Sequence, residues 1–159
     1  MARHMRPELL AGFHPVKAPP VEAIVAHYQR LTPDDRRLRF GGTLSEEQLS
    51  RMARDAVHRG VETLGLMTGD HLAALAETFE IPGTGFAEAA FSVEHDLQGH
   101  YTGWHLLNEV LREAARKPLR GIIFQCAATN AAMLGLARHA GAVLQYQGSE
   151  ITYRLHLGA

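Results

Sequence analysis

A short segment between residues 86 and 104 carries the residues of this chain that are best suited to bind a phosphate. A strand-like run from Phe86 to Val93 is followed by Gln98-Gly99-His100-Tyr101-Thr102-Gly103 and then by a helical pattern. A glycine-containing turn at a helix start leaves backbone N–H groups unpaired, and the positive end of the helix dipole adds to their attraction for an anion. The pattern therefore predicts a phosphate or pyrophosphate site, with an ordinary tight turn as the alternative.

The same segment resembles the acetyl-CoA signature of the GNAT superfamily of acyl-CoA-dependent N-acyltransferases. In that signature a strand ending in Val precedes Gln/Arg-x-x-Gly-x-Gly/Ala, and here Phe91-Ser92-Val93 precedes Gln98 to Gly103. Further along the chain, Asn130 opens a helix that ends in a glycine before a strand, which resembles the second family motif. The sequence from Leu31 to Phe40 is similar to the first-helix region of many members of the superfamily. The resemblance as a whole extends from about Val21 to Leu157.

The resemblance implies that acetyl-CoA binds as a co-substrate. Backbone groups of Phe91 and Val93 would pair with the pantetheine arm like an added strand, and Asn130 would bond near the pantetheine or the thioester. The pyrophosphate would be held by the signature turn and the helix start, namely Gln98, Gly99, His100, Tyr101, Thr102, Gly103 and Trp104. Asn is also a good helix N-cap, so a purely structural role for Asn130 remains open.

Two positions depart from the family pattern. Tyr101 stands where the signature usually has a Gly, which allows the backbone to approach the pyrophosphate closely. We expect glycine at this position to tighten CoA binding, and to loosen the helix start by ~1 kcal/mol. Ala137 stands where the family often places a tyrosine as general acid. A non-catalytic module that binds acyl-CoA or a protein partner is therefore the alternative to an enzyme.

Acyl transfer to an amine requires a base, because only the neutral amine attacks the thioester. Glu88 is the candidate base, since several family members that resemble the stretch Phe86-Ala87-Glu88 carry their catalytic glutamate there. A solvent-facing strand glutamate is the alternative. The resemblance thus implies an N-acetyltransferase that moves an acetyl group to a primary amine of a small molecule or protein by direct attack.

Other chemistries find little support in the sequence. His95, His100 and His105 recur every five residues, which fits neither one helical face nor a familiar metal site, so we expect no metal. Cys126 lies in an apolar run, as expected of a buried structural thiol. No Gly-x-Ser-x-Gly nucleophile elbow is present.

Composition narrows the class of protein and its partners. The formal net charge is −1, without a basic block, which argues against nucleic acid or an anionic membrane as the main partner. No stretch approaches the ~20 apolar residues that span a bilayer, and the start of the chain does not read as a signal peptide. A single cysteine excludes an internal disulfide framework and fits a cytoplasmic location. The sequence leaves a homodimer open.

The periodicity of apolar residues predicts the elements that position these candidates. Residues 1–20 read as an irregular N-terminal arm with a weak strand signal at Val16, and residues 21–159 as a single domain. Helices are expected over 21–31, 45–60, the stretch containing 107–114, and 130–140, with a short turn from Thr32 through Arg39. Strands are expected over 61–67, 72–79, 86–93, 121–126, 142–146 and 151–157. This order predicts an α+β protein, and the resemblance implies the GNAT fold, with a mixed central sheet of about six to seven strands and about four flanking helices.

Overall fold

The computed structural model describes residues 12–99 and 101–158. The elements follow in the order β1 (His14–Lys17), α1 (Val21–Arg30), α2 (Pro33–Phe40), α3 (Glu46–His58), β2 (Glu62–Thr68), β3 (His71–Ile81), β4 (Phe86–Val93), η2 (His95–Leu97), α4 (Thr102–Ala115), β5 (Gly121–Ala127), α5 (Ala131–His139), β6 (Val143–Gln147) and β7 (Glu150–His156).

One mixed sheet of seven strands organises the described residues, in the order β1-β2-β3-β4-β5-β7-β6. Neighbouring strands are antiparallel except β4 and β5, which are parallel. The α+β class and the strand count are confirmed, and the weak signal at Val16 corresponds to β1. The expected turn from Thr32 through Arg39 is instead the eight-residue helix α2, so the described residues hold five α-helices rather than about four.

Local sequence signals explain where these helices begin and end. In α2 the Thr32 hydroxyl accepts a bond from the Asp35 N–H at 3.1 Å, and Gly41 ends the helix with a φ of 79°. The helix α3 begins with the predicted capping box, in which Ser45 and Gln48 bond each other's backbone N–H groups. These caps satisfy backbone donors that a helix end leaves unpaired.

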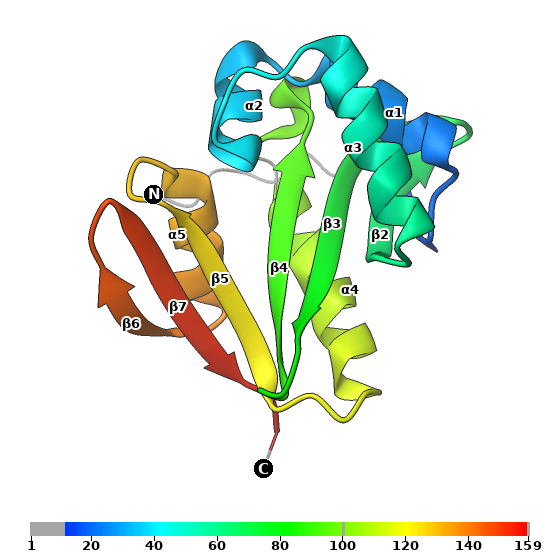
Figure 1. Ribbon diagram of the computed structural model, residues 1–159. Helices are drawn as coiled ribbons and strands as arrows, with labels where there is room; N and C mark the ends of the chain where they lie inside the picture. The colour runs from blue at the N-terminus through cyan, green and yellow to red at the C-terminus, as the bar shows by residue number, and fades with distance from the viewer. Residues whose placement is uncertain (1–11, 100, 159) are drawn as a thin grey trace.

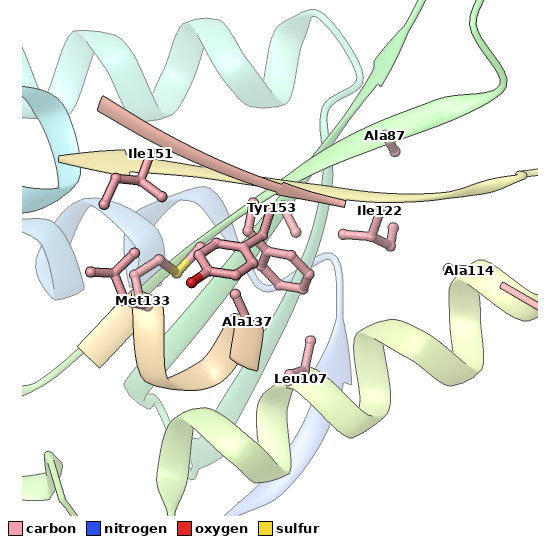
Figure 2. Close-up of a cluster of buried hydrophobic side chains, with 11 residues drawn as sticks. Ala87, Leu107, Ala114, Ile122, Met133, Ala137, Ile151 and Tyr153 are labelled. Carbon is pink, nitrogen blue, oxygen red and sulfur yellow. The ribbon is translucent and has the colours of Figure 1, made fainter. Parts of the chain in front are cut away.

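The two faces of the sheet are covered by different helices (Figure 1). The helices α1 and α3 pack on β2 and β3 from one side, around Ile24, Leu49 and Leu72. The helices α4 and α5 cover the opposite side, where Met133 and Ala137 of α5 approach Ile122 and Tyr153 of the sheet (Figure 2). Burial of these apolar faces is the main term that holds the layers together.

The parallel strands β4 and β5 separate halfway along their length. They pair only from Phe86 to Glu88 with Gly121 to Ile123, and beyond that point each strand continues without the other. In Figure 1 the two strands meet at the bottom and diverge toward the top. The middle of the sheet therefore has an open edge on β4, next to the start of α4.

Candidate functional site

A cleft of about 390 Å³ lies where β4 and β5 have separated. The end of β4, the turn after it, the first turn of α4, the helix α5 and the α1–α2 segment form its walls. Nine of the predicted cofactor residues line this cleft: Phe91, Val93, Gln98, Gly99, Tyr101, Thr102, Gly103, Trp104 and Asn130. His100, the remaining one, lies outside the described residues.

The open edge of β4 presents backbone groups to the cleft. The Glu94 N–H donates to the Ala73 carbonyl at 2.9 Å, so this residue points its backbone toward β3. The direction of backbone hydrogen bonding alternates along an antiparallel strand. The backbone groups of Phe91 and Val93 therefore point away from β3, toward the side on which β5 no longer pairs with β4. The Val93 carbonyl accepts a bond from the Gln98 side chain at 3.0 Å. The Val93 N–H and both Phe91 groups remain for an extended ligand.

The first turn of α4 is open to the same cleft. Its N-cap residue, Tyr101, makes no side-chain capping bond. The backbone N–H groups of Thr102, Gly103 and Trp104 have no acceptor within the described ranges. The buried Thr102 hydroxyl donates to the Leu97 carbonyl at 2.8 Å and fixes the turn against the helix. Unpaired N–H groups at the positive end of a 14-residue helix suit an anion such as a pyrophosphate.

Tyr101 has a left-handed backbone, with a φ of 61° and a ψ of 13°. A residue with a Cβ pays roughly 1–2 kcal/mol for this conformation, whereas glycine adopts it freely. The backbone of the turn thus requires the conformation that a glycine would supply. The sequence analysis expected a glycine at position 101 to loosen the start of the helix. The structure corrects this expectation, because a glycine would relieve the backbone strain of Tyr101, and this gain offsets the larger conformational entropy that glycine loses on folding.

We predict that Tyr101→Gly binds CoA several-fold more tightly, because the tyrosine side chain lines the cleft and is 40% exposed. The free energy of unfolding should stay equal or rise by up to ~1 kcal/mol. Isothermal calorimetry with CoA and a denaturant titration measure the two quantities. Weaker CoA binding by a fully folded variant would mean that the ring is a ligand contact instead of an obstruction.

Asn130 and Trp104 each combine a structural contact with a place in the cleft wall. The side-chain oxygen Oδ1 of Asn130 accepts a bond from the Met133 N–H at 3.1 Å, so the N-cap interpretation is confirmed, while the NH₂ group of the same side chain is left for a ligand. The Trp104 ring packs edge-on against His139 at 4.3 Å between centroids, and both residues line the cleft. Ala137, by contrast, is 1% exposed within the core.

Glu88 lies at the last paired position before β4 and β5 separate, opposite Phe79 and Ile123. It is partly buried, does not line the cleft, and its carboxylate accepts no hydrogen bond from the described residues. Burial raises the pKa of Glu88, nearby Arg39 opposes this rise, and Glu150 adds to it. A carboxylate with a raised pKa, placed where the strands part, is a candidate general base.

The sequence analysis did not single out the residues that the α1–α2 segment contributes to the cleft. They are Leu31, Asp35, Leu38 and Arg39. Arg39 bonds Glu77 at 3.0 Å, and burial raises the pKa of Glu77 to about 7. One buried oxygen of Asp35 has no hydrogen-bond partner in the described part of the chain. The sequence analysis missed them because they reach the cleft through the packing of distant segments, as the bond between Arg39 and Glu77 illustrates.

A buried histidine supports the strand that forms the cleft floor. The fully buried His27 donates from Nδ1 to the Leu72 carbonyl at 3.0 Å, so its Nε2 accepts the Ser92 hydroxyl at 2.8 Å. Burial lowers the pKa of His27 to about 4, and the Arg30 charge acts in the same direction. An imidazole with so low a pKa is a poor base, so we interpret the pair as a structural link between α1 and β4.

We predict that this histidine makes stability depend on pH. Below pH ~6.5 the unfolded chain binds a proton at His27 that the folded chain refuses until about pH 4, so acid favours unfolding. The free energy of unfolding should lose about 3 kcal/mol across this window relative to a His27→Gln variant. The raised pKa of Glu77 acts in the opposite sense, but equally in both proteins. Urea titrations between pH 7.5 and 4 test this, and parallel curves for the two proteins would contradict it.

Neither a metal centre nor an activated thiol is evident in the described residues. No group of three His, Cys, Asp or Glu side chains there is arranged to hold a metal ion. Burial, with a contribution from Glu150, raises the pKa of the Cys126 thiol and makes it a weaker nucleophile at neutral pH. Across residues 12–99 and 101–158, no helix has both the length and the apolar character needed to cross a membrane.

Comparison with known proteins finds its matches among solved structures. No family model matches the sequence, and no curated protein matches it. The GNAT domain of S. lividans PAT superposes with a TM-score of 0.73 at 19% identity, covering 91% of this chain and 89% of that one. RimL, a ribosomal L7/L12 alpha-N-protein acetyltransferase solved with coenzyme A, has a TM-score of 0.74 at 14% identity, covering 92% and 95%. An acetyltransferase from Salmonella typhimurium that modifies the N-terminal serine of L7/L12 has a TM-score of 0.73 at 15% identity, covering 93% and 96%.

Proposed function

We propose that this chain, which has the GNAT fold, is an acyl-CoA-dependent N-acetyltransferase that moves an acetyl group from acetyl-CoA to a primary amine of a small molecule or protein. The observation that carries the proposal is the cleft, which joins the open backbone edge of β4 to the open first turn of α4. An extended arm with amide groups can pair with the first, and a pyrophosphate can bind the second. The coenzyme A bound to the similarly folded RimL supports this assignment.

Each part of the co-substrate has a complementary set of residues. The pantetheine amides would pair with the backbone of Phe91 and Val93, beside the Asn130 amide group. The pyrophosphate would lie on the N–H groups from Gly99 to Trp104, at the positive end of α4. The rings of Trp104 and His139 would cover the apolar portion of the arm.

The chemistry requires one proton acceptor near the amine. A carbon–nitrogen bond forms between the amine and the thioester carbon, the carbon–sulfur bond breaks, and CoA leaves as a thiolate that takes up a proton from water. Glu88 would take the proton that the amine loses, and its raised pKa brings this carboxylate closer to the operating pH of a general base. An unpaired backbone N–H on the β4 edge suits the developing charge on the thioester oxygen.

A thiol-release assay with acetyl-CoA and a panel of primary amines, beside calorimetry with CoA, tests the proposal. We expect CoA to bind and the amines to accelerate thiol release. Binding without release for any amine would favour a non-catalytic acyl-CoA-binding module. Absence of binding would favour a protein-interaction module. We place the reaction in the cytoplasm, since the lone Cys126 fits a reducing compartment.

A further inference from the structure

The sheet face opposite α4 and α5 carries two guanidinium groups near the paired end of β4 and β5. Arg154 lies 4.8 Å and Arg120 lies 5.4 Å from the centroid of the Phe86 ring. The His156 ring packs edge-on against the same ring at 5.6 Å. We call these four residues the arginine patch. In Figure 1, α5 lies behind β5 and β7, and the face that carries the patch points toward the viewer.

A glycine on β5 makes this arrangement fit. A Cβ added at Gly121 would lie 2.7 Å from the Phe86 ring and 2.1 Å from the Leu155 carbonyl, so the ring lies across this position. Phe86, Gly121 and His156 are direct neighbours in the strand register. The absence of a side chain at Gly121 lets the aromatic ring extend toward β7, where Arg154 covers it.

The charges of the patch are not compensated within residues 12–99 and 101–158. Neither the Arg120 nor the Arg154 side chain forms an ion pair there, and the buried Nε of Arg154 has no hydrogen-bond acceptor. Two like charges on one ring repel each other, and a buried donor without an acceptor destabilises the folded chain. An anion held by the two guanidinium groups would offset the repulsion between them.

The arginine patch shares a face and a cross-strand row with Glu88. Glu88 is opposite Ile123 of β5, and Ile123 is opposite Arg154 of β7. Cross-strand partners point to the same face, and adjacent strands lie ~4.8 Å apart, so the backbones of Glu88 and Arg154 are separated by roughly 10 Å. The other charged groups around Glu88 are Arg39, Glu77 and Glu150.

From this arrangement we propose that the arginine patch anchors the acceptor, which is a small amine carrying a carboxylate or phosphate at its other end. The Arg154 guanidinium lies over the Phe86 ring, and Phe86 is two residues, or roughly 7 Å, from Glu88 on the same face of β4. The anion would take the free guanidinium donors of Arg154 and Arg120, and the amine would then lie beside Glu88 at the point where the strands part. The inference rests on the proposed function. A guanidinium fork favours such oxyanions by geometry as well as by charge.

The kinetic test compares aminohexanoate, aminohexyl phosphate and hexylamine, which share one carbon chain and differ in the terminal group. The wild-type kcat/KM should be roughly 10- to 100-fold higher for an anionic acceptor than for hexylamine. The better of the two anionic acceptors identifies the preferred group. Arg154→Met should remove this advantage, Arg154→Lys should keep part of it, and both should leave the rate with hexylamine within about twofold of wild type. Arg112→Met, an exposed arginine of α4 paired with Glu109, is the matched control.

A binding measurement separates this inference from the proposed function. Titration with inorganic phosphate or acetate should shift the Nε–Hε resonance of Arg154, which is missing in Arg154→Met. If the protein transfers acetyl groups without preference for anionic acceptors and the Arg154 resonance does not move, the arginine patch does not bind the acceptor, while the proposed transferase function stands. If the resonance moves but the protein acetylates no amine, the proposed transferase function is wrong, while the arginine patch is still an anion-binding site. A melting curve that matches wild type shows that Arg154→Met is folded.

Discussion

Replacing Glu88 with Gln is expected to lower the acetyl-transfer rate by ~10²- to 10⁴-fold, which is the usual contribution of a general base. The substitution keeps the shape of the side chain and removes its ability to accept a proton. Because Glu88 does not line the cleft, the affinity for CoA should stay nearly constant. Steady-state kinetics with saturating acetyl-CoA, beside calorimetry with CoA, measure the two effects.

The pH profile of the same variant identifies the group that titrates. In the wild type, the rate should fall as the pH drops through the pKa of Glu88, because the protonated carboxyl cannot accept a second proton. Burial raises that pKa, so this limb should lie above the ordinary range of a glutamate. In Glu88→Gln the limb should vanish and leave only the titration of the amine itself.

A neighbouring glutamate supplies the matched control. Glu80 of β3 is exposed and lies opposite Ala87 of β4. Its side chain therefore points to the face of the sheet opposite that of Glu88. Glu80→Gln removes the same charge from the same region and should keep the full rate. If Glu88→Gln retains more than about half of the wild-type rate across the pH range, Glu88 is not the base.

Local signals in the sequence were sufficient for most of the fold. The capping box at Ser45, the alternation in β7 and the apolar run of β5 each report on neighbours within a few residues. The same holds for much of the cleft wall, since residues 91 to 104 follow one another in the chain. A prediction that needs only local periodicity and turn chemistry can therefore find these elements.

Features that depend on distant segments could not be predicted in this way. Arg39 reaches the cleft because α2 packs across the end of β4, and its bond to Glu77 joins residues far apart in the sequence. The left-handed backbone of Tyr101 is a local feature, but it was not predicted because a tyrosine rarely adopts this conformation. The arginine patch depends on a register that brings β4, β5 and β7 together. None of these relations leaves a periodic signal in the chain.

The double variant Gly99→Val, Gly103→Val is expected to lose roughly 10²-fold or more in affinity for CoA, because hydrogen bonds to a charged group contribute ~1.5–3 kcal/mol each. Gly99 has a φ of 76°, which a β-branched residue adopts only under strain. A Cβ at Gly103 would lie 3.2 Å from a methyl group of Leu136, between α4 and α5. Both changes displace backbone N–H groups from the place proposed for the pyrophosphate.

Gly83→Val separates the loss of the site from backbone strain. Gly83 has the same φ of 76°, but it lies in the turn between β3 and β4, with no atom within 4 Å of an added Cβ. This control should lose stability like Gly99→Val and keep its affinity for CoA. Pantetheine, which lacks the pyrophosphate, adds a second comparison, because its weaker binding should be nearly the same in the double variant and the wild type. If the folded double variant binds CoA as tightly as the wild type, then the first turn of α4 does not hold the pyrophosphate.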